Sequence, residues 1–218
     1  MIRNVTIVPS ILTDNKQEYR RQVERINVFT RRVQIDVTDG KFTQNETLDI
    51  TNVWWPQNWE ADLHLMATNP SEHLDTILKL NPSLCIFHAE ASEDLMPSFQ
   101  ALQEAGIKIG VALLPSTLPG NVKHYIDIAD HVLIFAGQLG VQGSPADLMQ
   151  MEKIPLIRNM KPEVEIGWDG GANMTNIRAL AHADLDIINV GSAIAKAENP
   201  GAAFEELVAE IDKNGVVI

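Results

Sequence analysis

The chain has 218 residues, of which 45% are hydrophobic and 21% charged, a composition typical of a folded globular protein rather than a disordered one. Its 17 basic and 29 acidic residues give a net charge of −12, which argues against a nucleic-acid partner, and no basic cluster indicates a membrane surface. We recognise neither a signal-peptide pattern nor an apolar stretch of membrane-spanning length, so we expect a cytoplasmic protein.

Eight short β-branched runs alternate with amphipathic stretches along the chain. The predicted strands are 5–8, 33–37, 61–66, 84–88, 108–113, 131–135, 163–168 and 186–190. Most are too apolar for a sheet with one solvent-exposed face, so we expect parallel strands covered on both sides. Helical spacing follows the first and third strands and is clearest at the end, where Asn199 can cap a helix that begins at Pro200. Its apolar stripe is Phe204, Leu207, Val208 and Ile211.

Eight such units in this length amount to about 27 residues each, the scale of a strand–helix repeat in a compact barrel. We therefore predict a single (β/α)8 barrel of the α/β class, with residues 1–218 forming one domain. A doubly wound open sheet is less favoured, because no Gly-x-Gly-x-x-Gly follows the first strand. The link 41–58 lacks a helical period and is expected to be a long loop with at most a short helix. Its Trp54 and Trp55, with Trp59, are expected to serve an interface, a lid or the core.

In a (β/α)8 barrel the active site lies at the C-terminal ends of the strands. Unusual polar residues fall at these ends, namely Ser10, Gln34, Asp36, Asp39, His64, His88, Glu90, Asp169 and Ser192. Because side chains alternate along a strand, Gln34 and Asp36 should point into the barrel, as should His64 and Asp169. A buried carboxylate is costly unless it is paired or bound to a metal, so these residues indicate either a metal site or an acid/base pair.

Two of the predicted strands are followed by small residues that suit an anion. Gly170-Gly171 and Gly191-Ser192, each expected to open a helix, are candidate phosphate cradles, because glycine lets backbone N–H groups approach the anion. In such barrels a phosphate often lies beside the loops after strands seven and eight. His88 fits a structural or a functional role equally well, whereas four histidines are expected to be solvated, namely His73, His124, His131 and His182.

Seven short motifs in the same order give the chain a resemblance to the ribulose-phosphate 3-epimerase family. They are Val8-Pro9-Ser10-Ile11-Leu12, Asp36-Val37-Thr38-Asp39-Gly40-Lys41-Phe42, Asp62-Leu63-His64-Leu65-Met66, His88-Ala89-Glu90-Ala91, Gly110-Val111-Ala112-Leu113, Asp169-Gly170-Gly171 and Gly191-Ser192-Ala193-Ile194. The resemblance implies a (β/α)8 barrel that interconverts ribulose 5-phosphate and xylulose 5-phosphate, both small-molecule sugar phosphates. It also implies a homo-oligomer, since the family often forms one.

The resemblance further implies roles for individual residues. Asp36 and Asp169 match the two aspartates that exchange the C3 proton on opposite faces of the substrate. Asp36, His64 and Asp169 match ligands of a divalent metal, often Zn, Fe or Mn, which holds the enediolate oxygens. The remaining matches are substrate contacts, namely Ser10, His64, Met66, Gly140, Gly143, Gly170, Gly171, Gly191 and Ser192.

Two departures from the family pattern concern the metal and the phosphate. Gln34 stands where the family has a second histidine ligand, and its neutral carbonyl oxygen is a poorer ligand for a transition metal than imidazole. We therefore expect a weakened or altered metal site, with Gln34 as its fourth ligand where a metal binds. The loop 137–144 keeps Gly140 and Gly143 but little else of the family's Asn-Pro-Gly-Phe-Gly-Gly-Gln.

Three functions stay open at this point. Asp36 and Asp169 favour a sugar-phosphate 3-epimerase, an isomerase. Gln34 and the altered loop favour a non-catalytic or altered-specificity barrel that binds phosphosugars without the full metal site. A phosphosugar lyase or decarboxylase is least favoured, because no predicted strand offers an obvious inward catalytic lysine.

Overall fold

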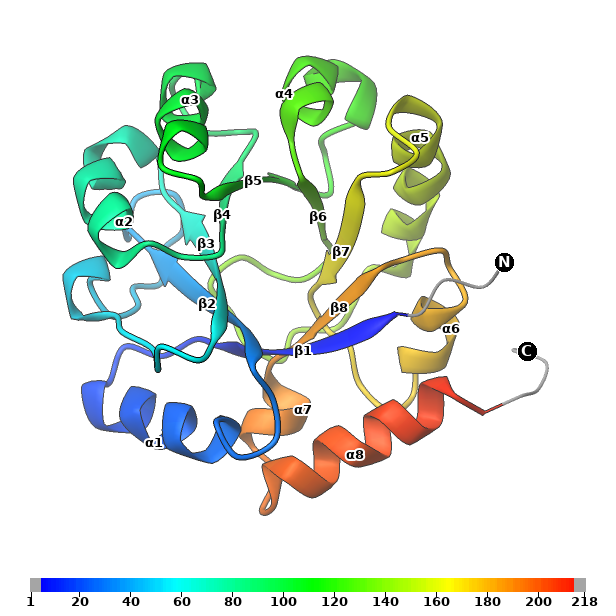
Figure 1. The fold of residues 1–218 in the computed structure, drawn as a ribbon. Helices are drawn as coiled ribbons and strands as arrows, with labels where there is room; N and C mark the ends of the chain where they lie inside the picture. Colours follow the sequence, from blue (N-terminus) through cyan, green and yellow to red (C-terminus); the bar gives the residue numbers. More distant parts are fainter. Residues whose placement is uncertain (1–4, 214–218) are drawn as a thin grey trace.

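A computed structural model describes residues 5–213. Eight parallel strands pair in chain order and close into a barrel, with the last strand paired to the first (Figure 1). The strands are β1 (Thr6–Ile11), β2 (Arg32–Thr38), β3 (Glu60–Met66), β4 (Leu84–His88), β5 (Lys108–Leu113), β6 (His131–Phe135), β7 (Glu165–Asp169) and β8 (Ile187–Val190). The predicted (β/α)8 barrel is confirmed.

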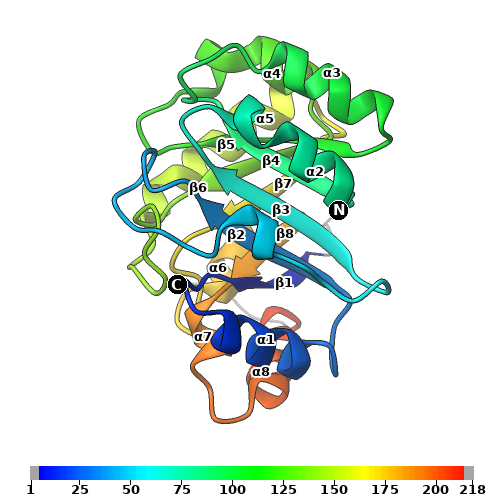
Figure 2. The ribbon, with the colours of Figure 1, turned by 90° about the vertical axis from the view of Figure 1, so that its left-hand side faces the viewer.

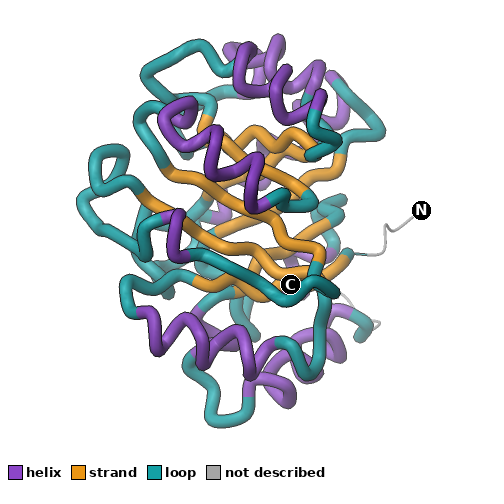
Figure 3. Tube along the Cα trace, turned by 60° about the vertical axis from the view of Figure 1, so that its left-hand side comes forward, coloured by secondary structure: helices purple, strands orange, loops and turns teal. Residues whose placement is uncertain are grey.

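Helices surround this barrel on the outside (Figure 3). The α-helices are α1 (Lys16–Ile26), α2 (Leu74–Leu80), α3 (Met96–Glu104), α4 (Lys123–Ile128), α5 (Lys153–Met160), α6 (Ile177–Ala181), α7 (Ser192–Ala195) and α8 (Pro200–Ile211). Short 3₁₀ helices are η1 (Ile50–Asn52), η2 (Pro70–His73), η3 (Pro119–Val122) and η4 (Leu148–Glu152). Within residues 5–213, no helix has the length and apolar character needed to cross a bilayer.

The last helix begins as its sequence predicts. The Asn199 side chain accepts a hydrogen bond from the Ala202 N–H, and Pro200 occupies the first turn, where its missing N–H costs nothing. At the start of α1, the Asn15 side chain accepts from two backbone N–H groups, those of Gln17 and Glu18. Side-chain caps therefore fix the start of both helices that flank β1.

The segment between β2 and β3 covers the barrel without an α-helix, as the missing helical period predicts. Only η1 interrupts this loop, and its apolar side chains replace a helix as the outer layer, namely Leu48, Ile50, Val53 and Trp59. Trp59 is 5% exposed and donates its indole N–H to Asn27, while Trp55 packs against the same core. Trp54 is half exposed and meets Tyr19 edge to face. Two of the three tryptophans thus serve the core.

The alternation of side chains along the strands is also as predicted. Ile35, Val37, Leu63 and Leu65 belong to the core between the barrel and its outer layer, whereas a separate interior cluster contains Leu84, Ile86, Ala112 and Leu133. Strand boundaries differ slightly from the prediction. β1 extends to Ile11, so Ser10 lies within the strand instead of after it, and β7 ends on Asp169 itself.

A cluster of charged residues closes the N-terminal end of the barrel. Arg32 contacts Asp62 at 2.8 Å and binds both carboxylate oxygens of Glu165, which also contacts His131 at 2.7 Å. The expectation that His131 is solvated was wrong, because its ring is buried and fills space that Gly167 leaves free inside the barrel. Burial alone would raise the pKa of Glu165, but the hydrogen bonds from Arg32 and His131 hold it far below its ordinary value.

This cluster should contribute measurably to stability. Replacing Arg32 with methionine leaves two poorly solvated carboxylates without their cation, so we expect a loss of about 3 kcal/mol in the free energy of unfolding. Arg20→Met is the matched control, since that arginine is largely exposed and its ion pair should contribute less than about 1 kcal/mol. Urea denaturation of both variants measures the difference, and equal losses would contradict the structural role of Arg32.

Candidate active site

A pocket opens at the C-terminal ends of the strands, the end toward which the strand arrows point in Figure 2. Eleven residues singled out in the sequence line it, namely Ser10, Asp36, His64, Met66, Gly140, Gly143, Asp169, Gly170, Gly171, Gly191 and Ser192. Gln34 lies one layer deeper on β2 and is fully buried. The fold therefore brings every predicted site residue to one end of the barrel.

The amide of Gln34 joins the two aspartates at the bottom of the pocket. Its Nε2 donates to Asp36 Oδ1 at 2.8 Å and to Asp169 Oδ2 at 2.7 Å. Its Oε1 is buried and has no hydrogen-bond partner among the described residues. One N–H₂ group thus links carboxylates from β2 and β7, two walls that are separated by β8 and β1.

Two histidines extend this network away from the pocket. His64 Nδ1 lies 2.9 Å from Asp36 Oδ1, and its Nε2 lies 2.9 Å from Nε2 of His88. Only one of these two Nε2 atoms can carry the shared hydrogen. His88 Nδ1 in turn lies 3.5 Å from Glu90, which accepts the backbone N–H of Leu114 at 2.9 Å. His88 therefore holds the ring of His64 in place. His64 lines the pocket, whereas His88 lies behind it.

Burial and charge set the protonation of these groups. Burial and the neighbouring carboxylate of Asp36 raise the pKa of Asp169, although the nearby His64 and the Gln34 hydrogen bond oppose this shift. Burial disfavours a charged His64, yet its hydrogen bond to Asp36 raises its pKa on balance. Burial lowers the pKa of His88 to about 4. The carboxylate of Asp36 thus favours a protonated His64, whereas burial favours a neutral His88.

The donor atoms at the pocket floor fit a divalent cation. One ligand atom from each of Asp36, His64 and Asp169 lies within 4.8 Å of the others. Carboxylate oxygen and imidazole nitrogen suit zinc, iron and manganese. The unpartnered Oε1 of Gln34 supplies a fourth donor if the amide turns over, and His88 provides the outer hydrogen bond that usually orients a ligating histidine.

Close loop packing at the rim explains the glycines there. A Cβ on Gly170 would lie 2.2 Å from the Gly137 nitrogen, and one on Gly171 would lie 2.2 Å from the Ala146 nitrogen. Both have positive φ, which favours glycine. The expectation that Gly170-Gly171 opens a helix was wrong, because α6 begins only at Ile177. Here the glycines serve first to bring the loops after β6 and β7 together.

The loop after β2 also meets the loop after β6 above the pocket. Asn45 donates to the Gly140 carbonyl at 3.0 Å, and the Thr43 hydroxyl lies 3.3 Å from the Leu139 carbonyl. The loops after β2 and β6 lie side by side at the left edge of Figure 2. Asp39 helps to shape the first of them, since its carboxylate accepts backbone N–H groups at Lys41, Phe42 and Thr68.

Sequence reasoning missed nine residues that line the pocket, namely Leu12, Phe135, Gly137, Gln138, Val141, Gln142, Ser144, Ala172 and Asn189. The sequence could have identified Asn189, because a polar side chain within the apolar β8 indicates an inward functional position. In the structure Asn189 pairs in register with Asp169. Most of the others lie in the loop after β6, whose path no local pattern predicts.

The fold and the pocket together define a β/α-barrel protein with an acidic, imidazole-containing site at the C-terminal ends of its strands. Its fold is similar to that of 3-hexulose-6-phosphate synthase from Salmonella typhimurium, with a TM-score of 0.68 and 14% identity over 95% of this chain and 98% of that one. The model of the ribulose-phosphate 3 epimerase family matches residues 6–195, and the chain belongs to that family.

Two curated relatives agree with this assignment. A ribulose-phosphate 3-epimerase, cytoplasmic isoform, from Oryza sativa subsp. japonica is 28% identical over 209 residues, covering 92% of each chain. A ribulose-phosphate 3-epimerase from Helicobacter pylori (strain J99) is 27% identical over 208 residues, covering 92% of this chain and 95% of the relative. The similarity thus spans nearly the whole barrel.

The packing at Gly170 can be tested directly. Gly170→Ala combines an unfavourable backbone conformation with a clash against the Gly137 backbone, so we expect a loss of stability of about 3 kcal/mol or more. Gly106→Ala is the control, since Gly106 also has a positive φ but open space around its Cβ position, and should cost about 1 kcal/mol. Chemical denaturation compares the two, and similar losses would show that the loops can separate freely.

Proposed function

We propose that the protein is a sugar-phosphate 3-epimerase that interconverts ribulose 5-phosphate and xylulose 5-phosphate. The observation that carries this proposal is the pair of acidic residues, Asp36 and Asp169, which converge on the pocket floor from β2 and β7. Inversion at a carbon needs one group to remove a proton and another to return one on the opposite face. Membership of the epimerase family supports the same conclusion.

In the proposed reaction the two aspartates exchange roles with the direction of catalysis. One carboxylate takes the proton from C3, and the electron pair of that C–H bond moves into a C2–C3 double bond as the C2 carbonyl oxygen becomes negative. The other aspartate, as the carboxylic acid, then delivers its proton to the opposite face of C3. The carbonyl re-forms, and the net change is inversion at C3.

The developing oxyanion needs positive charge or hydrogen-bond donors close by. Asp36, His64 and Asp169 would hold a divalent cation, and a bound cation would stabilise the negative charge on the oxygens. Gln34 holds the two carboxylates in place by donating a hydrogen bond to each, and His88 holds the ring of His64. These residues prepare the site before substrate arrives.

A binding barrel without catalysis is the second candidate, and the Gln34 hydrogen bonds are the observation that favours it. They partly satisfy both carboxylates without a cation, so the site does not depend on metal for its integrity. Saturable binding of ribulose 5-phosphate with no turnover in the presence of any divalent metal would support this candidate over the epimerase.

Removing either acidic group should abolish epimerisation while leaving the fold intact. We expect Asp36→Asn and Asp169→Asn to reduce kcat by roughly 100- to 10,000-fold, because general acid–base catalysis contributes about that much. Asp75→Asn, on the exposed face of α2, is the control for loss of a carboxylate. A coupled assay of xylulose 5-phosphate formation measures the effect, and wild-type activity in either site variant would contradict the two-base proposal.

Metal content should depend on Gln34. We expect Gln34→His to bind zinc at least about tenfold more tightly than the wild type, because imidazole is the better zinc ligand. Elemental analysis after chelator-free purification and dialysis measures this without any activity assay. Gln17→His, on the surface of α1, controls for the added histidine. Stoichiometric zinc retained by the wild type, with no gain in the variant, would show that Gln34 does not weaken the site.

A further inference from the structure

One residue of β8 places an amide without a partner inside the barrel. Asn189 is the one polar side chain of this strand, whose other residues are isoleucine and valine. It is 3% exposed, yet it lines the pocket, and its Oδ1 has no hydrogen-bond donor among the described residues. A buried carbonyl oxygen without a partner costs free energy, so native structures rarely keep one unless a ligand or water completes it.

The neighbouring strands offer Asn189 no donor. It pairs in register with Asp169 on β7 and with Val8 on β1. An ionised carboxylate is itself an acceptor, and a valine side chain has no polar group. Asp169 already accepts a hydrogen bond from Gln34. The missing donor must therefore come from the pocket.

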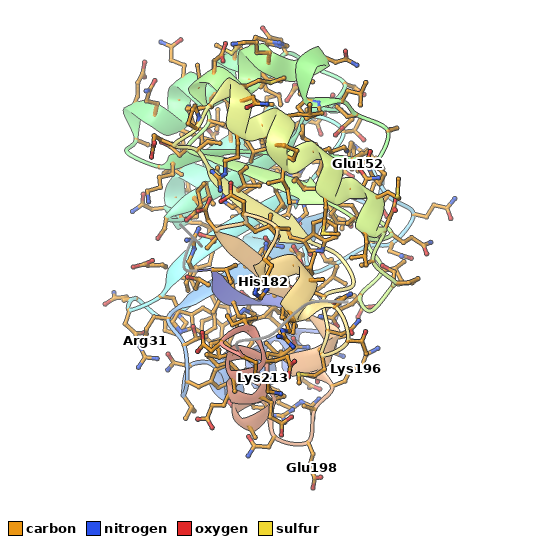
Figure 4. All side chains as sticks on the ribbon, turned by 90° about the vertical axis from the view of Figure 1, so that its right-hand side faces the viewer. Arg31, Glu152, His182, Lys196, Glu198 and Lys213 are labelled. Carbon is orange, nitrogen blue, oxygen red and sulfur yellow. The ribbon has the colours of Figure 1, made fainter. Side chains whose placement is uncertain are left out.

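Positive charge does not reach this position. Among residues 5–213, no Lys or Arg lines the pocket. Lys196, the nearest cation along the chain, follows α7 and lies exposed at the surface of the molecule, where Figure 4 labels it. No cationic side chain thus serves as the missing donor.

The depth of Asn189 indicates which part of a ligand it meets. Gly191 and Ser192, the candidate phosphate cradle, follow β8 at the rim of the pocket. Asn189 lies two residues earlier, deeper in the barrel and in register with Asp169. A ketose phosphate that is held at the rim by its phosphate and reacts beside Asp169 therefore brings the carbon in between past Asn189. In a pentulose 5-phosphate this carbon is C4, between the reacting C3 and the phosphorylated C5.

The chemistry of the amide selects a hydroxyl group. The carbonyl and phosphate oxygens of a ketose phosphate accept hydrogen bonds at neutral pH, whereas its hydroxyl groups also donate. A hydroxyl is therefore the group of such a substrate that completes an unpartnered carbonyl oxygen. It also accepts from an amide N–H, so the pairing holds whichever way the amide is turned.

We propose that Asn189 is a specificity-determining residue that binds the C4 hydroxyl group of the sugar phosphate, with its Oδ1 as the acceptor. A site with a buried acceptor discriminates strongly against a ligand that lacks the matching hydroxyl, because the acceptor is then left unpaired. Asn189 thereby selects ketoses that carry a hydroxyl beside the reacting carbon. This inference deepens the proposed function and rests on its assignment of a sugar-phosphate ligand.

The test is calorimetric binding of ribulose 5-phosphate, its 4-deoxy analogue and inorganic phosphate to the full chain and its variants. Asn189→Leu keeps the branching of the side chain but removes both polar atoms. We expect its affinity for ribulose 5-phosphate to fall by about 10- to 100-fold, the effect of leaving a buried hydroxyl unpaired. The 4-deoxy analogue and inorganic phosphate should bind the variant as they bind the wild type.

Thermal stability separates a binding role from a structural one. Because the Oδ1 of Asn189 is unpaired in the free protein, an apolar replacement should leave the melting temperature unchanged or raise it. A structural role predicts a lower melting temperature instead. Asn189→Val, with a smaller side chain, provides a second variant in case leucine overfills the barrel.

Asn159→Leu, on the exposed surface of α5, makes the same chemical change away from the pocket and should bind like the wild type. Affinity for ribulose 5-phosphate within twofold of the wild type in both Asn189 variants overturns the inference. So does an equal loss for the 4-deoxy analogue or for inorganic phosphate, a lower melting temperature in both variants, or a fall in kcat without a loss of affinity. Binding without epimerisation contradicts the proposed function instead and leaves this inference supported.

Discussion

Asp36 and Asp169 bring two acidic groups within 4.8 Å of each other inside the barrel, where two negative charges repel by about 3 kcal/mol at an effective dielectric constant of 20. Burial adds to that cost. The groups around the pair offset it in three ways, through the N–H₂ of Gln34, through the ring of His64, and through a raised pKa of Asp169. Two carboxylates that would destabilise an apolar interior can therefore persist side by side at the pocket floor.

The two ends of the barrel differ in how they accommodate buried charged residues. At the N-terminal end, Arg32 neutralises Asp62 and Glu165 directly, and the ion pairs seal the interior. At the C-terminal end, the carboxylates face a pocket and are linked by a neutral amide, which leaves room for a cation or a substrate. Ion pairing and the pocket are thus separated along the strands. Strand β2 contributes to both ends, with Arg32 at one, Asp36 at the other, and Gln34 at the one inward position between them.

Much of this arrangement follows from the sequence. Side chains alternate between the two faces of a strand, and this alternation determines which residues point into the barrel. The sequence alone therefore predicts that Asp36, His64 and Asp169 share the barrel interior. Asn199 and Pro200 likewise fix the start of α8. Alternation alone does not distinguish a metal site from an acid/base pair. The family resemblance is what implies a role for each of these residues.

Other features depend on contacts between distant segments. The expectation of a solvated His131 was wrong because its burial depends on Glu165 and on the space left by Gly167, which lie on the neighbouring strand. The position of the Gln142 side chain depends on how the loop after β6 packs against Gly191 and Ser192. The orientation of the Gln34 amide depends on two carboxylates from different strands. No local pattern encodes contacts of this kind.

The central claim is that Asp36 and Asp169 act on opposite faces of one carbon atom, and isotope exchange in D₂O tests it most directly. Each single variant, Asp36→Asn or Asp169→Asn, retains one base and should exchange the C3 hydrogen of only one of the two epimers, ribulose 5-phosphate or xylulose 5-phosphate, without interconverting them. The two variants should exchange opposite epimers. Exchange of the same epimer by both variants, or of both epimers by one of them, would contradict the account.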